Sequence, residues 1–251
     1  MPGPRLFPNV APGVHRVEHA FVNCYLVEEG RALTIVDTAF PSTWRRMPEI
    51  LDALGHTPSD VAAVVLTHAH FDHLGFAAAA LQQLNVPVYL HHGDRRLARN
   101  PYAYRRERPA LLYPLLYPRG VPALLAMARA GAFWVKGVSE VHELPAQGVL
   151  DVPGRPHLVF TPGHTFGHCA LHLPERDAVL TGDALVTLDP YKGQRGAQIV
   201  AGAATADSGM ALLALDALAA TGAGVVLPGH GEPWRDGVES AVAAARAAGR
   251  S

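Results

Sequence analysis

The stretch THAHFDHLG at residues 67–75 places three imidazoles and one carboxylate within six positions. Imidazole and carboxylate are ligands of zinc and other first-row divalent ions, so this H-x-H-x-D-H spacing predicts a metal site. The run before it, residues 61–66, is short, β-branched and apolar, which predicts a buried strand. Residues 74–84 have helical composition. We therefore expect a strand-to-helix turn on which four candidate ligands converge: His68, His70, Asp72 and His73.

Three later loops carry the same residue types, and each lies just past a predicted apolar strand. The loop TPGHTFGH at residues 161–168 contributes His164, and the loop TGDAL at residues 181–185 contributes Asp183. The loop LPGHGEPW at residues 227–234 contributes His230. These three side chains complete the set of candidate metal ligands.

The elements that must position these loops begin with strands and continue with alternating strands and helices. Predicted strands cover residues 14–19, 21–28, 32–38, 61–66, 86–91, 141–144, 149–152, 157–161, 169–173, 178–181 and 224–227. Predicted helices cover residues 42–54, 74–84 and 207–221, and a last helix begins at about residue 238. Gly55 and Gly222 are the expected stop signals of two of these helices.

The composition fits one soluble globular domain or two small ones, and we predict a single domain spanning residues 1–251. Hydrophobic residues make up 49% of the chain and charged residues 17%, and the net charge of −1 predicts no general affinity for nucleic acid or anionic membranes. Cys24 and Cys169 lie inside predicted strands, so we expect core thiols and no disulfide. The sequence shows no signal-peptide pattern and no apolar run of membrane-spanning length, which predicts a cytoplasmic location.

Residues 95–138 interrupt the alternation and differ in charge from the rest of the chain. They hold eight Arg and one Lys against one acidic residue, a net charge of +8, whereas the remaining 12 basic and 21 acidic residues give −9. We interpret the segment as a helical insertion, with a short helix at residues 122–130 stopped by Gly131. It is expected to form a cap over the edge of the fold that carries the metal ligands. The guanidinium groups of Arg105, Arg106 and Arg108 could then bind a substrate carboxylate or phosphate through paired hydrogen bonds. A dimer interface and a solvated basic face stay open as alternatives.

Together, the four motifs resemble the metallo-β-lactamase superfamily over nearly the whole chain outside the insertion. The resemblance implies an α/β (α+β) fold, the αβ/βα four-layer sandwich of two mixed β-sheets flanked by helices, with the metals at one edge. It also implies two metal ions, the first on His68, His70 and His164, the second on Asp72, His73 and His230, with Asp183 bridging them.

Such a site has the chemistry of a hydrolase. Three protein ligands per metal leave positions open for water, which is typical of catalytic sites. Two ions roughly 3.5–4 Å apart can produce a bridging hydroxide near neutral pH. Zinc is the favoured metal, with iron and manganese as alternatives. Asp183 as the bridge and Asp72 as a proton shuttle are the predicted catalytic residues.

Three other residues have candidate supporting roles. The resemblance implies that Asp37 is a buried carboxylate beneath the histidine turn. His168 has two equal interpretations, as a residue that orients a ligand or as a histidine satisfied by backbone groups. The lactonases of this family place a catalytic tyrosine three residues after the bridging aspartate, where this chain has Val186. Tyr191 is therefore the candidate substitute.

We predict a metal-dependent hydrolase of a small ester, thioester or lactone. True β-lactamases of this fold are exported and lack an aspartate at the bridging position, which disfavours that activity. Glyoxalase II enzymes bind glutathione with an added helical C-terminal domain, whereas only a short segment follows His230. The alternatives are a mononuclear iron sulfur dioxygenase and a metal-dependent phosphodiesterase or nuclease. The expected partner is an acyl or anionic small molecule. Nucleic acid is disfavoured, no membrane partner is expected, and a homodimer through the insertion stays open.

Overall fold

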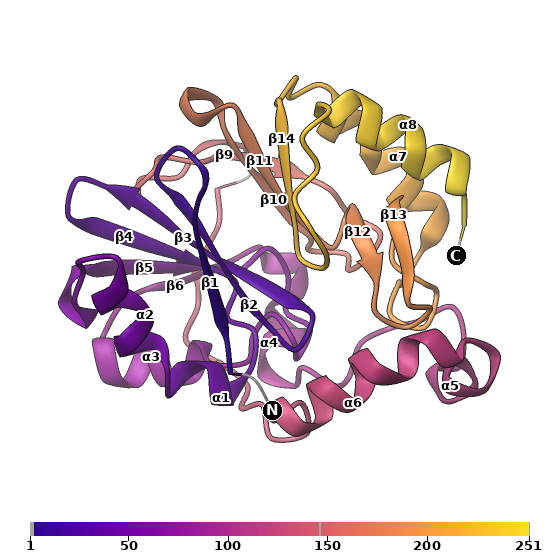
Figure 1. The fold of residues 1–251 in the computed structure, drawn as a ribbon, viewed down its shortest axis with the longest axis horizontal. Coiled ribbons are helices and arrows are strands. Elements are labelled where there is room, and N and C mark those ends of the chain that lie inside the picture. Colours follow the sequence, from indigo (N-terminus) through magenta and orange to yellow (C-terminus); the bar gives the residue numbers. More distant parts are fainter. Residues whose placement is uncertain (1–2, 146, 251) are drawn as a thin grey trace.

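Two mixed β-sheets lie face to face in the computed structural model, which describes residues 3–145 and 147–250 (Figure 1). The first sheet has its strands in sequence order, antiparallel from β1 to β4 and parallel from β4 to β7. These strands are β1 (Arg5–Ala11), β2 (Val14–His19), β3 (Val22–Glu29), β4 (Ala32–Val36), β5 (Val61–Val65), β6 (Val88–Leu90) and β7 (His142–Glu143).

The second sheet has the order β14-β11-β10-β9-β8, and its only parallel pair is β11 with β14 among the described residues. Its strands are β8 (Gly148–Val149), β9 (His157–Phe160), β10 (Cys169–Leu173), β11 (Ala178–Gly182) and β14 (Val225–Pro228). A separate antiparallel pair, β12 (Val186–Asp189) and β13 (Gln194–Gln198), follows β11 in the chain.

Helices cover the outer face of each sheet. Helices α1 (Pro41–Trp44), α2 (Met47–Ala53) and α3 (Ala77–Leu84) pack on the first sheet, and α7 (Ser208–Ala219) and α8 (Val238–Ala248) pack on the second (Figure 1). A middle core joins the two sheets through side chains such as Val27, Val65 and Leu171. Strands with apolar residues on both faces require this double coverage. The predicted four-layer sandwich is therefore confirmed.

The insertion is helical, as predicted, and contacts both halves of the sandwich. It contains α4 (Arg95–Arg99), α5 (Tyr113–Leu116) and α6 (Val121–Ala130), and Gly131 ends α6 with a φ of 105°. Ser42 Oγ on α1 donates to Ala130 O at 2.5 Å. At the other end, a Cβ added to Gly120 would lie 2.1 Å from Tyr191 O, so the β12–β13 turn packs directly on the insertion. The segment thus crosses one edge of the two sheets (Figure 1).

The insertion also carries exposed apolar side chains. Leu111 is 89% exposed and Leu115 is 83% exposed, next to the half-exposed Leu112 and Leu116. Within the described residues no single helix has the length and apolar character to cross a membrane, although residues 110–116 and 118–130 meet that test as a bent pair.

Several predicted boundaries were wrong for local reasons. The helix predicted at residues 42–54 is divided into α1 and α2, because Pro48 has no N–H to continue the hydrogen-bond ladder. The strand predicted at residues 149–152 ends at Val149, because the chain then leads into a turn in which Arg155 N donates to Val152 O. Strands β1, β12 and β13 were not predicted, since none of them has a clean alternation of apolar and polar residues.

Candidate metal centre

The candidate ligands lie on loops at one edge of the sandwich, where strands of both sheets end. The histidine turn follows β5 of the first sheet, as predicted, and three loops of the second sheet face it. Strands β11 and β14 are parallel neighbours, so the residues that follow them, Asp183 and His230, lie close together. The backbone N–H of Cys169 donates to Thr67 O at 2.9 Å, which joins the loops of the two sheets.

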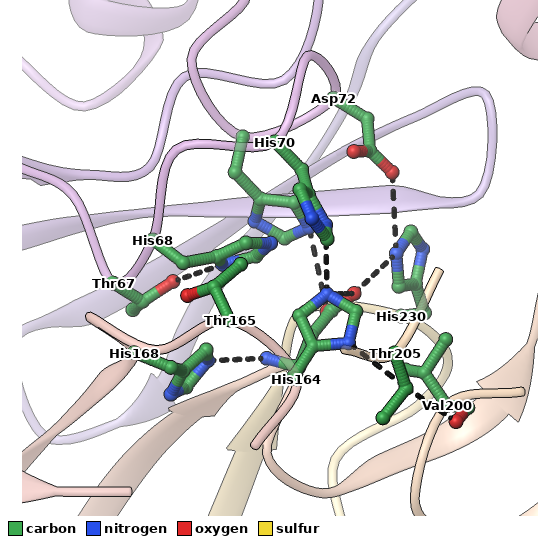
Figure 2. A network of polar contacts seen from close by, with 12 residues as sticks. Thr67, His68, His70, Asp72, His164, Thr165, His168, Val200, Thr205 and His230 are labelled. Atoms are coloured by element: carbon green, nitrogen blue, oxygen red, sulfur yellow. Dashed lines mark hydrogen bonds and ion pairs between the residues drawn. The ribbon is translucent and has the colours of Figure 1, made fainter. Parts of the chain in front are cut away.

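All seven predicted ligands are buried and converge on one region. Figure 2 shows His68, His70 and Asp72 approaching from one side and His164 and His230 from the other. Their ligand atoms form three groups, and within each group all atoms lie within 4.8 Å of one another. The groups are His68, His70 and His164; His68, His73 and Asp183; and Asp72, His73 and His230. The first and third groups are the two sets that the sequence implied.

Asp183 contacts members of both sets. Its Oδ1 lies 3.3 Å from His73 Nε2, and its Oδ2 lies 3.2 Å from His230 Nε2, both from the second set. The same Oδ2 lies 3.4 Å from His164 Nε2 of the first set. A carboxylate in this position can contribute one oxygen to each of two ions.

The donor atoms fit divalent metal ions. Among the buried atoms without a hydrogen-bond partner in the described residues are Nε2 of His68, His73 and His230 and Oδ1 of Asp183. A buried polar atom without a hydrogen-bond partner costs about 1–3 kcal/mol, and bound cations would remove this cost for the cluster. Neutral imidazoles with carboxylates are the ligand set that zinc, iron and manganese accept.

Four of the histidine rings are oriented by a bond on their other nitrogen. The Nδ1 partners are Thr67 Oγ1 for His68 at 3.0 Å, Asp37 Oδ2 for His73 at 2.9 Å, Thr205 Oγ1 for His164 at 3.3 Å and Phe21 O for His230 at 2.8 Å. A bond at Nδ1 fixes the tautomer and turns Nε2 towards the centre, as in other histidine metal sites. His70 differs, because its Nδ1 faces His164 Nε2 at 2.9 Å.

The charges of the centre also prepare it for cations. Burial, together with the neighbouring imidazoles, holds the pKa of His68 and of His164 well below the usual value. Burial alone would lower the pKa of His230, but the charges and hydrogen bonds of Asp183 and Asp72 together outweigh burial and raise the pKa to about 10. Burial would raise the pKa of Asp183, yet His230 and His73 hold it well below its usual value. Metal binding must therefore displace protons from the second set.

Asp37 lies beneath the histidine turn, where the resemblance placed it. Its carboxylate accepts from Thr67 N and Thr67 Oγ1, both at 2.8 Å, and from His73 Nδ1 at 2.9 Å. His168 orients a ligand loop, because its Nε2 accepts from Asp183 N at 3.0 Å and its Nδ1 bonds to Thr161 Oγ1 at 2.8 Å. Both interpretations of His168 thus apply, since the backbone group that satisfies it belongs to a candidate ligand.

Gly229 allows the second sheet to bring its loops together. A Cβ at this position would lie 2.2 Å from Asp183 Oδ1 and 2.7 Å from His73 Cε1. Both distances are shorter than van der Waals contact, so any larger residue would displace the carboxylate that lies between the two sets. The close packing of the site therefore requires a glycine at this position, the first glycine of the PGHG motif.

The predicted substrate residues occupy different positions around the centre. Arg105 lines a hollow beside His70 and His164, with its guanidinium 5.7 Å from the ring centre of Phe166. Arg106 lies over the ring of Tyr104, and Arg108 does not line this hollow. The side chain of Arg108 instead lies beside Gly202, because the chain turns at this point and Arg108 N donates to Gly202 O.

Tyr191 lies next to Tyr104 and does not itself line the hollow. The two hydroxyl oxygens are 3.5 Å apart, and the ring of Tyr104 packs 4.4 Å from the ring of His70. Tyr104, which comes from the insertion, is thus the tyrosine that lines the hollow beside the candidate ligands.

Sequence reasoning missed the buried carboxylate that ties two ligand loops together. Asp94 accepts from Ala69 N at 3.0 Å, Thr165 Oγ1 at 2.7 Å and Gly167 N at 2.9 Å. Asp94 could have been found from the sequence, because it is an acidic residue that lies soon after the predicted strand at residues 86–91. Thr205 and Arg96 were also missed, and neither belongs to a recognisable motif. His91 and His92 do not contact the centre, and His92 lies on the surface 3.2 Å from Glu143.

A model of the metallo-beta-lactamase superfamily matches residues 18–230. The chain is 28% identical over 188 residues to the probable metallo-hydrolase YflN of Bacillus subtilis (strain 168), covering 72% of this chain and 67% of that protein. All seven candidate ligands fall inside the matched range.

Two solved structures share the architecture. A metallo-beta-lactamase family protein from Thermus thermophilus, TTHA1429, has a TM-score of 0.63 at 27% identity, covering 92% of this chain and 79% of that one. TTHA1623, solved in a di-iron-bound form, has a TM-score of 0.62 at 27% identity, covering 87% of this chain and 92% of that one.

Proposed function

Since the chain belongs to the metallo-β-lactamase superfamily, we propose that it is a dinuclear metal-dependent hydrolase of a small ester, thioester or lactone. The family supports a metal-dependent hydrolase as the general function. The number of metals and the acyl substrate are the new parts of the proposal. The position of Asp183 supports two metals, because its two oxygens lie 3.2–3.4 Å from histidines of both ligand sets. The hollow beside His70, which Tyr104 lines, supports a small acyl substrate.

The two ligand sets would hold two divalent ions, with Asp183 between them. Zinc is the proposed metal, and the di-iron form of TTHA1623 supports iron as the alternative, with manganese as a third candidate. When bound, such ions act as Lewis acids and lower the pKa of a shared water towards neutrality. The remaining steps belong to side chains of this protein.

Asp72 is the proposed proton carrier. It is buried, and its Oδ2 lies 3.5 Å from His230 Nε2. Burial would raise the pKa of Asp72, but His230 and His73 outweigh that effect and lower it, so the carboxylate is ionised at neutral pH. It can therefore accept a proton from the attacking water and deliver it to the leaving oxygen or sulfur.

Tyr104 is the proposed hydrogen-bond donor to the substrate, and Tyr191 is the residue that orients it. Burial raises the pKa of both hydroxyls, so both stay protonated at neutral pH. Tyr104 lines the hollow beside His70, and this position supports a contact between its hydroxyl and a bound acyl group. A phenol there can stabilise negative charge that develops on the carbonyl oxygen.

The experiment that tests the proposal is Asp183→Asn, measured by elemental analysis and by hydrolysis of esters, thioesters and lactones. Asparagine keeps the shape but loses the charge that holds two cations together, so bound metal and activity should fall together. Asp52→Asn is the control, because it makes the same change of charge at an exposed carboxylate on α2, away from the centre. Two tightly bound metals with unchanged turnover in Asp183→Asn would contradict the bridge.

The same assays separate the other functions of this fold. One iron per chain with oxygen consumption identifies a mononuclear sulfur dioxygenase. Cleavage of phosphodiesters, with binding that weakens steeply as salt is added, identifies a nuclease that uses the basic insertion. Either result would replace the acyl hydrolase.

A further inference from the structure

A small hollow opens beside the candidate metal centre. Its volume is about 180 Å³, and His70 and His164 of the first ligand set form part of its lining. The other walls are largely apolar, from Leu97, Tyr104 and Phe166. Ligand pockets for drug-sized molecules measure roughly 300–1,000 Å³, so this space suits only a short substrate chain.

Two exposed arginine residues line the same hollow without a carboxylate partner. Arg96 comes from α4 and Arg105 from the segment after it, and neither forms an ion pair with any residue that the structure describes. Asp94 is the one acid in the lining, but it is 2% exposed and already accepts three hydrogen bonds from Ala69, Thr165 and Gly167. The positive charge of the hollow is therefore not neutralised by the protein.

We propose that this hollow binds a carboxylate at the far end of a short acyl substrate, held by Arg96 and Arg105. The inference rests on the proposed function, because it takes the scissile carbonyl to lie at His70 and His164. Guanidinium forks bind carboxylates through paired hydrogen bonds, and the apolar walls accept the methylene groups between the two ends. The preferred substrate is then the monoester or monothioester of a dicarboxylic acid with about four or five carbons.

Size favours a carboxylate over a phosphate, which offers the same oxyanion chemistry. A water molecule occupies about 30 Å³ in the liquid, so the hollow holds the equivalent of roughly six waters. A three- or four-carbon segment with a carboxylate fills most of that space. A phosphate in its place leaves less room for the chain that must reach the metal centre.

The test compares two substrates that differ only in charge. The S-phenyl monothioester of glutaric acid and the S-phenyl thioester of glutaramic acid have nearly the same shape, but only the first carries a terminal carboxylate. We expect the wild-type protein, loaded with metal, to show kcat/KM at least about tenfold higher for the acid. In Arg96→Gln/Arg105→Gln this ratio should fall to about one, through KM, while bound metal is retained.

Arg99→Gln is the control variant, because Arg99 is an exposed residue on α4 that does not line the hollow. Its acid-to-amide ratio should equal that of the wild type. An equal loss in Arg99→Gln would show that the preference comes from the general charge of the insertion, and it would overturn the assignment to Arg96 and Arg105.

Calorimetry keeps this inference separate from the proposed function. The metal-loaded protein should bind glutarate about tenfold more tightly than butyrate, and the double variant should not discriminate between them. Discrimination without hydrolysis of any thioester would reject the acyl hydrolase and retain the carboxylate site. Equal binding of glutarate and butyrate to the wild type would reject the site, and tighter binding of 4-phosphonobutyrate than of glutarate would reject the carboxylate as the ligand.

Discussion

Asp37→Asn should weaken the second metal more than the first. The carboxylate of Asp37 accepts three hydrogen bonds, from Thr67 N, Thr67 Oγ1 and His73 Nδ1. An asparagine has one acceptor oxygen and one NH₂ group at this position, so at least one of these donors loses its partner.

Both orientations of the new amide are unfavourable. If its oxygen accepts from Thr67 N, its NH₂ faces His73 Nδ1 and forces the proton of that ring onto Nε2, the atom that faces Asp183. If the amide is reversed, Thr67 N is buried without an acceptor, which costs about 1–3 kcal/mol. Changes in groups that orient metal ligands typically cost 10–100-fold in metal affinity, and we expect a loss of that size for the second ion. His68 contacts the hydroxyl of Thr67 and does not contact Asp37 itself, so the first ion should be affected less.

The assay is a chelator competition that reports the affinity of each ion in turn, with urea unfolding of the metal-free protein beside it. Asp52→Asn is the control, because Asp52 is exposed on α2 and lies away from the centre. The free energy of unfolding should fall by about 1–3 kcal/mol in Asp37→Asn and stay unchanged in the control. An affinity for both ions within a factor of two of the wild type would refute the reasoning.

Three further outcomes are expected. His230→Ala should retain one metal ion by elemental analysis, since His68, His70 and His164 form a complete set without it; loss of both ions from a folded protein would contradict the partition. Gly229→Ala should lower kcat/KM by about a hundredfold, because its Cβ would displace Asp183, whereas Gly202→Ala, which meets only side-chain atoms at 3.3 Å or more, should not. Burial raises the pKa of the Cys169 thiol to about 12 and also raises that of Cys24. Neither thiol should therefore react with iodoacetamide at mildly alkaline pH until the protein is unfolded. Rapid labelling of the native protein would contradict this, because it would show that the packing around β3 and β10 opens in the folded state.

The candidate ligands could be predicted from the sequence because each occupies a loop with an unusual residue string. HAHFDH, PGHT, TGD and PGHG place polar residues at the ends of apolar strands, and parallel strand ends must meet at one edge of a sheet. The ligand atoms of the seven side chains then lie close together in the structure.

The supporting residues could not be predicted in the same way. Thr205 bonds His164 across 41 positions, and Phe21 contributes only a backbone carbonyl to His230 across 209. Neither residue type signals this role, because threonine hydroxyls and backbone oxygens occur everywhere in a chain. The tertiary packing of the loops decides which of them reach a ligand.

The insertion shows the same limit. Its charge and helices were evident from composition, but the sequence treated Arg105, Arg106 and Arg108 as one cluster. The chain turns between them, so Arg105 lines the hollow, Arg106 lies over Tyr104, and Arg108 lies beside Gly202. Such a turn depends on tertiary contacts, notably the bonds of Glu107 with Gly202 and Ser208.

The most direct test of the account is a metal titration of the metal-free protein followed by thioester hydrolysis at each step. We expect two ions to bind per chain and hydrolysis to reach its maximum only when the second ion is bound. Full activity with one ion, or no hydrolysis of any ester, thioester or lactone with two ions bound, would contradict the dinuclear acyl hydrolase.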